Sequence, residues 1–218
     1  GDMTILNIGS INRDRVFHVH HFPARGETLT ASRVKVGLGG KGLNHSVAIH
    51  RTGGKVRHLG EIGHNDEEIR SRIAAFGLSL DAIVEVEHHF TGSAQILVDE
   101  TGENQIVLDP GAKRQIPLDA TTSAIDNLVP ERDWLLMQNE SNGLVAATTR
   151  AKFRKIRVAL AAAPFEAGRI LSILANLDLL AVNAVEFEQL CQALGGPHAL
   201  LSELTLFVSR GADGAELR

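Results

Sequence analysis

The second half of the chain alternates between short apolar runs and segments with helical periodicity. The apolar runs span residues 134–137, 158–162, 177–182 and 206–209, and helical periodicity is found around residues 144–153 and 186–194. Short, continuously apolar runs are typical of strands buried on both faces. Regular alternation of such strands with helices predicts a parallel sheet covered by helices on both faces.

The first half has a different pattern. Residues 4–9 and 56–62 are predicted to be buried strands, and residues 43–51 a helix. A second helix is predicted after Asp66, where a capping residue and acidic first turn precede Ile69 and Ile73. Between these elements, apolar and polar residues alternate over residues 13–38, and again on either side of the turn at residues 99–104. Alternation indicates strands with one wet face, so we expect two antiparallel hairpins.

These patterns predict an α/β fold with a mostly parallel, doubly wound sheet. We expect one domain over residues 1–218, with lid strands from about 13–38 and 90–110 standing out as a separate layer. A half-wet β layer on an α/β body suits a lid over a ligand site at the strand ends.

Composition narrows the class of protein. The 218 residues are 44% hydrophobic and 22% charged, with a formal net charge of −4, which is globular and argues against nucleic acid as a partner. No apolar run approaches the roughly 20 residues of a membrane span, and the first residues lack the pattern of a signal peptide. Cys191 is the only cysteine, which excludes an internal disulfide. We expect a cytoplasmic protein without membrane partners.

The glycine-rich segment at residues 37–44 has three interpretations. Gly37, Gly39 and Gly42 satisfy the GxGxxG pattern of dinucleotide-binding folds, with Glu61 about twenty residues further on, so an NAD-dependent oxidoreductase is one. A plain turn that caps a helix is another. We favour the third, in which glycines let backbone amides at a helix N-terminus approach a polar ligand, because the preceding segment alternates instead of being buried.

Polar side chains follow several of the predicted strands. Asn12 and Asp14 form a polar turn after the first strand, Glu140 follows residues 134–137, and Asn183 and Glu186 follow residues 177–182. Each of them alone is explained by a helix cap or a turn. Because the carboxyl ends of parallel strands share one edge of a sheet, together they predict a ligand site there.

Six segments, in order along the chain, resemble the ribokinase-like (PfkB) carbohydrate kinases. They are residues 9–14, 26–28, 39–44, 110–112, 183–186 and 208–214. The resemblance implies an ATP-dependent kinase that phosphorylates a hydroxyl of a small sugar, and the combination of Asn12, Asp14, Asn44 and Glu140 points first to ribose. Because a lid with a wet hairpin can pair with a second lid, we also expect a homodimer formed through the lid.

The resemblance also implies roles for individual residues. Sugar-binding positions of the family match Asn12, Asp14, Gly40, Lys41, Asn44 and Glu140. Nucleotide-binding positions match Asn183, Ser209 and Gly211, and Glu186 matches a residue that holds Mg²⁺ through water. The cofactors implied are ATP and Mg²⁺, with a monovalent cation such as K⁺ as a further candidate.

One family motif does not occur in these residues. The DTxGAGD-like stretch that carries the family's catalytic Asp is absent, so no catalytic base is identified here and we expect that Asp, with the C-terminal part of the fold, beyond Arg218. The alternative functions are a catalytically inactive sugar-binding or regulatory protein on the same fold and the NAD-dependent oxidoreductase.

Overall fold

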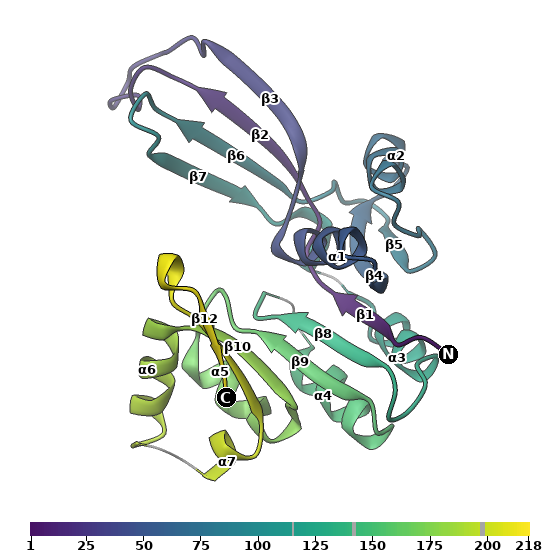
Figure 1. The fold of residues 1–218 in the computed structure, drawn as a ribbon. Coiled ribbons are helices and arrows are strands. Elements are labelled where there is room, and N and C mark those ends of the chain that lie inside the picture. Colours follow the sequence, from purple (N-terminus) through teal and green to yellow (C-terminus); the bar gives the residue numbers. More distant parts are fainter. Residues whose placement is uncertain (115, 141–142, 197–198) are drawn as a thin grey trace.

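The computed structural model describes residues 1–114, 116–140, 143–196 and 199–218, and its strands form two separate sheets (Figure 1). The strands are β1 (Thr4–Ile8), β2 (Asn12–His18), β3 (Arg33–Gly39), β4 (Lys55–Gly63), β5 (Ile83–Val86), β6 (Ser93–Val98), β7 (Asn104–Asp109), β8 (Trp134–Gln138), β9 (Arg157–Ala161), β10 (Leu179–Asn183), β11 (Thr205–Ser209) and β12 (Ala215–Leu217). The α-helices are α1 (Lys41–Arg51), α2 (Glu67–Ala75), α3 (Leu118–Asp126), α4 (Leu144–Phe153), α5 (Ala167–Ile173), α6 (Ala184–Ala193) and α7 (Ala199–Ser202). Short 3₁₀ turns occupy η1 (Gly111–Arg114), η2 (Leu174–Asn176) and η3 (Gly211–Asp213).

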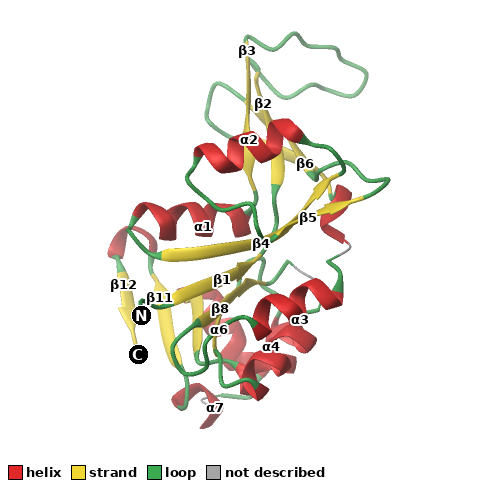
Figure 2. Cartoon of the chain, turned by 90° about the vertical axis from the view of Figure 1, so that its right-hand side faces the viewer, coloured by secondary structure: helices red, strands yellow, loops and turns green. Residues whose placement is uncertain are grey.

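The main sheet has eight strands in the order β12-β11-β10-β9-β8-β1-β4-β5. All neighbours in it are parallel except β12, which runs antiparallel to β11. Figure 2 shows α1 on one side of β4 and β1, and α3 and α4 on the other. This arrangement confirms the predicted mostly parallel α/β sheet with helices on both faces.

Two hydrophobic clusters hold these layers together. The larger one includes Leu6 and Ile8 of β1, which pack against residues of α3 and α4. The smaller one lies under α1 and α2, where Ile69 and Ile73 are fully buried, as the periodicity predicted. Coverage is incomplete at the far edge, since Phe207 is 41% exposed although we expected helices over the whole sheet.

The smaller sheet, β3-β2-β6-β7, is the predicted lid and stands away from the body (Figure 1). Its two hairpins, β2–β3 and β6–β7, are joined by a parallel pairing of β2 with β6, which the sequence pattern did not predict. Strand β2 starts at Asn12, so the interpretation of Asn12 and Asp14 as a polar turn is wrong. Both belong to the lid strand, because the chain leaving β1 enters the smaller sheet almost at once.

An ion-pair cluster fastens the lid to α2. The guanidinium of Arg13 in β2 donates from Nη2 to both carboxylate oxygens of Asp66, at 2.9 and 3.0 Å, and also pairs with Glu68. Asp66 in addition accepts from Thr91 Oγ1 at 2.6 Å and from the backbone N of Ile69, which caps α2. Burial raises the pKa of Asp66, but the bonds from Thr91 and Arg13 outweigh it and hold the pKa below its usual range.

Several elements had no sequence prediction, namely β5, α3, α5, α7 and β12. Within the ranges described above, no helix has the length and apolar character needed to cross a bilayer.

Candidate active site

The glycine-rich turn joins the lid to the body through two close backbone approaches. Gly40 is the N-cap of α1 with φ 98°, and a Cβ there would lie 2.5 Å from the carbonyl oxygen of Ser10. A Cβ on Gly42 would lie 2.4 Å from the backbone of Gly9. The backbone N of Leu43 donates to Ser10 O at 3.0 Å. Only glycine permits this contact, so the start of α1 sits directly on the chain that leaves β1.

The dinucleotide interpretation of this segment is wrong. A dinucleotide fold requires a buried central strand before the glycines, whereas β3 belongs to the lid, pairs only with β2, and exposes Val34 and Val36. Glu61, the acidic residue of that pattern, lies inside β4 with 1% exposure. Burial raises the pKa of Glu61 to about 8, so it is not a charged ribose-binding carboxylate at neutral pH.

On the lid side, Asp14 lies against Gly39 of β3, and Asn12 lies against Gly92, which directly precedes β6. A Cβ on Gly39 would come within 1.9 Å of Asp14 Oδ2, and one on Gly92 within 3.1 Å of Asn12 Oδ1. Asn12 is 8% exposed. Both side chains therefore occupy the base of the lid, close to the turn at Gly40.

Glu140 connects the end of β8 to this turn. Its carboxylate accepts from Ser10 Oγ at 2.7 Å and from Lys41 Nζ at 3.1 Å. The pair with Lys41 is partly shielded, since the Glu140 side chain is 22% exposed. Sequence reasoning found Glu140 and Lys41 separately but missed Ser10, for which direct adjacency to Gly9 at the end of β1 was the available signal.

A cavity of about 230 Å³ opens at the carboxyl ends of β9, β10 and β11. Its lining residues are Lys41, His45, Ala161, Ala162, Ala163, Ala181, Val182, Asn183, Glu186, Phe207 and Ser209. Asn183 and Ser209 are direct neighbours in register across β10 and β11. Four residues that the sequence had indicated, on three segments of the chain, therefore line one cavity: Lys41, Asn183, Glu186 and Ser209. Asn44, which is exposed, and Gly211, the first residue of η3, do not line this cavity.

Asn183 and Glu186 also form the N-terminal cap of α6. Asn183 Oδ1 accepts from the backbone N of Glu186 at 2.8 Å, and Glu186 Oε1 accepts from the backbone N of Asn183 at 3.1 Å. The helix-cap explanation therefore applies to both residues. The cap uses Glu186 Oε1, and Glu186 also lines the cavity.

The side chains at this cavity can hold a magnesium ion only if water and substrate phosphates supply most of its ligands. The described ranges contain no group of three or more His, Cys, Asp or Glu side chains arranged to hold a metal. A single carboxylate suits Mg²⁺, which keeps several waters and is commonly completed by substrate phosphates. Among the described residues, Glu186 is thus the one that would hold the ion, with water and substrate phosphates as the other ligands.

A buried polar network lies beneath the glycine-rich turn. Asn7 donates from Nδ2 to Gly42 O and to Ser46 Oγ, both at 2.8 Å, and Ser46 contacts His58 Nδ1 at 2.7 Å. Gln138 donates from Nε2 to Asn7 Oδ1 at 2.8 Å. Burial lowers the pKa of His58 to about 4, so its imidazole is neutral at pH 7. The turn is held in place by neutral, hydrogen-bonded groups.

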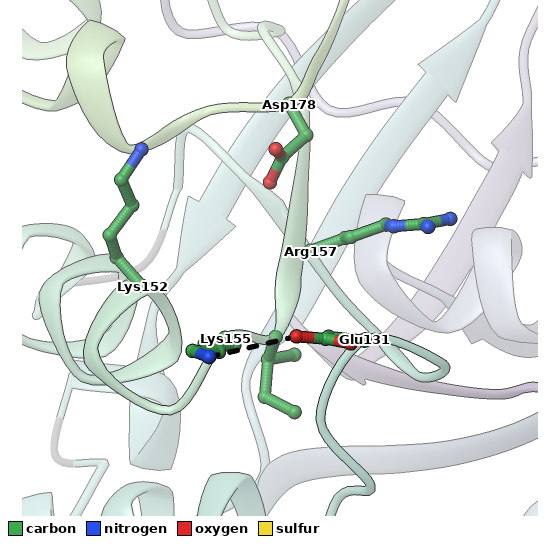
Figure 3. A pocket seen from close by; sticks show the side chains of 6 residues that line it. Glu131, Lys152, Lys155, Arg157 and Asp178 are labelled. Atoms are coloured by element: carbon green, nitrogen blue, oxygen red, sulfur yellow. Dashed lines mark ion pairs between the residues drawn. The ribbon is translucent and has the colours of Figure 1, made fainter.

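A second cavity, of about 350 Å³, lies at the amino ends of β9 and β10 (Figure 3). Its charged side chains are used in structural contacts. Lys155 pairs with Glu131 at 3.7 Å, Lys152 donates to Ala175 O at 3.1 Å, and the carboxylate of Asp178 accepts from the backbone N of Val158 at 2.8 Å. We assign no ligand to this cavity.

Residues 3–217 match the model of the pfkB family carbohydrate kinases. The chain is 34% identical over 191 residues to a ribokinase of Haemophilus influenzae, covering 85% of this chain and 61% of that protein. It therefore spans less than two thirds of that relative's length.

Solved structures show the same fold. A ribokinase of Thermotoga maritima superposes with a TM-score of 0.81 at 28% identity, over all of this chain and 75% of that one. A ribokinase of Cryptococcus neoformans var. grubii, solved in complex with ADP, gives a TM-score of 0.82 at 25% identity, over all of this chain and 76% of that one.

Proposed function

Because the chain belongs to the pfkB family of carbohydrate kinases, we propose that it transfers the γ-phosphoryl group of ATP to a hydroxyl of a small sugar, with ribose as the first substrate to test. One observation carries this proposal. Lys41 belongs to two groups of residues at once, since its ammonium pairs with Glu140 near the lid and it also lines the cavity that contains Asn183, Glu186 and Ser209. A sugar on one side and a nucleotide on the other would meet at this lysine.

The lid side supplies the sugar-binding groups. Asn12, Asp14, Asn44 and Glu140 offer amide and carboxylate groups, which make directional hydrogen bonds to a set of sugar hydroxyls. Gly40 lets the chain approach closely, and Lys41 holds the Glu140 carboxylate and faces the incoming phosphate. The relative from Haemophilus influenzae, a ribokinase, supports ribose over other sugars.

The strand ends supply the nucleotide-binding groups, with Asn183 and Ser209 in the cavity and Gly211 beyond it. Mg²⁺ bound through Glu186 and water would neutralise charge on the transferring phosphoryl group. Phosphoryl transfer depends mainly on positioning and on such charge neutralisation. Lys41 adds a fixed positive charge at the point of transfer, and a monovalent cation such as K⁺ stays a candidate activator.

The proposed reaction also needs a base for the sugar hydroxyl. None of the assigned residues is placed for that role, and the DTxGAGD-like motif that would carry the base is not among these 218 residues. The alternative to be tested beside the kinase is a protein that binds a sugar without phosphorylating it.

The discriminating experiment measures ADP formed from ATP and Mg²⁺ by the full-length protein across a panel of pentoses, hexoses and nucleosides, together with calorimetric binding of each sugar. ADP release that depends on ribose supports the proposal. Ribose binding without ADP release supports the binding-protein alternative. If no sugar or nucleoside binds, both are rejected.

We further propose that two copies associate through the lid. Strand β7 is an edge strand exposed along its whole length, and it presents Ile106, Val107 and Leu108 at 52%, 70% and 57% exposure. Exposed apolar edge strands readily pair with another chain. Light scattering should give the mass of a dimer, and a monomer mass at micromolar concentration would contradict this assembly.

A further inference from the structure

His45 lies one helical turn after Lys41 on α1, and both side chains line the cavity at the ends of β9, β10 and β11. Residues spaced by four lie on the same face of a helix, so α1 directs both toward the same space. His45 had no predicted role, although its i, i+4 spacing from Lys41 was an available signal.

Hydrogen bonds fix the amide orientations that lead to His45. Gly42 O can only accept a hydrogen bond, so the Asn7 atom that faces it at 2.8 Å is the amide nitrogen. The other end of Asn7, Oδ1, must then accept, and the Gln138 atom at 2.8 Å from it is a nitrogen as well. That same nitrogen lies 3.0 Å from His45 Nδ1.

This chain of contacts decides which ring nitrogen of His45 carries the proton. Because Gln138 Nε2 is a donor, His45 Nδ1 must accept, and the proton of the neutral imidazole is on Nε2. Burial lowers the pKa of His45, which keeps the ring neutral at pH 7. Among the described residues Nε2 has no hydrogen-bond partner. The ring therefore presents an N–H group that the protein leaves available at the cavity.

We propose that His45 is a phosphate-binding residue, whose Nε2–H donates a hydrogen bond to a phosphoryl oxygen of the nucleotide beside Lys41. The inference rests on the proposed kinase function and extends it to a residue not assigned above. The neighbours of His45 in the cavity are those of the nucleotide side, Asn183, Glu186 and Ser209, whereas Asn12 and Asp14 do not line it. A phosphoryl oxygen is therefore the partner that this N–H group would meet.

Two substitutions of His45 test its two ring nitrogens separately. His45→Gln places an amide nitrogen close to the position of Nε2, so it keeps a donor at the cavity but removes the acceptor for Gln138. His45→Asn places an amide oxygen close to the position of Nδ1, so it keeps that acceptor but removes the donor. His88→Asn is the matched control, since His88 is exposed, does not line the cavity, and has φ 61°, which Asn tolerates.

The readouts are ATP affinity by calorimetry in the presence of Mg²⁺ and the urea midpoint of each variant. We expect His45→Asn to weaken ATP binding about tenfold with little change in midpoint, because a hydrogen bond to a charged acceptor is lost. We expect His45→Gln to bind ATP within about twofold of wild type but with a lower midpoint. The reverse pattern, or equal ATP affinity in all variants, would overturn the assignment.

Spectroscopy tests the wild-type chain independently of any variant. Long-range ¹H–¹⁵N correlation spectra should show His45 protonated at Nε2, and ATP should shift that resonance. A proton on Nδ1, or no shift at saturating ATP, would also refute the inference. If wild type binds ribose but no ATP, the kinase proposal itself fails. If it binds ATP normally while His45→Asn does too, only the role of His45 fails.

Discussion

Replacing Glu61 with glutamine should stabilise the protein at neutral pH. Glu61 lies in β4 with 1% exposure, and its Oε1 is buried without a hydrogen-bond partner among the described residues. Burial raises its pKa from 4.5 to about 8. At pH 7 the folded protein therefore keeps a proton on Glu61, and the neutral amide introduced by Glu61→Gln would mimic this protonated acid in size and polarity.

The magnitude follows from proton linkage. Between pH 4.5 and 8 the unfolded chain releases a proton from Glu61 that the folded chain retains, so stability falls as pH rises through this window. Each pH unit corresponds to about 1.4 kcal/mol, and pH 7 lies about 2.5 units above the unfolded pKa. Glu61→Gln removes this cost. We expect a gain of about 3 kcal/mol in the free energy of unfolding at pH 7, and less than about 1 kcal/mol at pH 5.

The assay is urea unfolding followed by circular dichroism at pH 5, 6, 7 and 8, for wild type, Glu61→Gln and the exposed control Glu103→Gln. The quantity to compare is the difference between each variant and wild type, in which the opposite pH dependence of His58, with its pKa lowered by burial to about 4, cancels. A difference for Glu61→Gln that does not grow between pH 5 and pH 8, or a net destabilisation, would show that Glu61 is ionised or that a partner stabilises its charge.

Three further substitutions test the lid and the turn. Asp14→Asn should weaken ribose binding, measured by calorimetry, about tenfold to a hundredfold while the melting temperature stays the same; unchanged affinity would remove Asp14 from the sugar site. Gly42→Ala should lower the free energy of unfolding in urea by about 3 kcal/mol, because the new Cβ would lie 2.4 Å from backbone atoms. The control is Gly37→Ala, whose Cβ would have no atom within 4 Å and which should change stability by less than about 1 kcal/mol. Asp66→Ala removes both the cap of α2 and the partner of Arg13. We expect the free energy of unfolding to fall by about 2–4 kcal/mol and amide exchange in β2 to become faster. Retained amide protection in β2 would contradict the proposed attachment of the lid.

Elements whose stability is local could be predicted from the sequence. The start of α2 needed only Asp66 as a cap and the buried pair Ile69 and Ile73, because both signals act within two turns of one helix. The turn at Gly40 was recognisable because positive φ favours glycine. By contrast, α3 and α5 were not predicted, and the register that joins the two hairpins through β2 and β6 depends on residues far apart in the chain.

The candidate site also combines local contacts, which the sequence predicts, with long-range contacts, which only the fold creates. Asn183 and Glu186 could be found from their spacing, because a capping box is a contact between residues three apart. The pairing of Lys41 with Glu140 spans 99 positions and depends on β1 and β8 being neighbours in the sheet. Sequence spacing alone does not determine which strands are neighbours.

The sequence by itself determined the fold class and the lid hairpins, because hydrophobic periodicity and turn residues act locally, whereas Lys41 and Ser209 entered the candidate site only through the family resemblance. Only the tertiary structure decided how deeply each residue is buried and which hydrogen bonds it makes. Burial made Glu61, the acidic residue of the GxGxxG pattern, a protonated core residue, and the contacts through Gln138 placed the proton of His45 on Nε2. Desolvation and long-range hydrogen bonds depend on the environment that the whole fold creates, and no local pattern of residues records that environment.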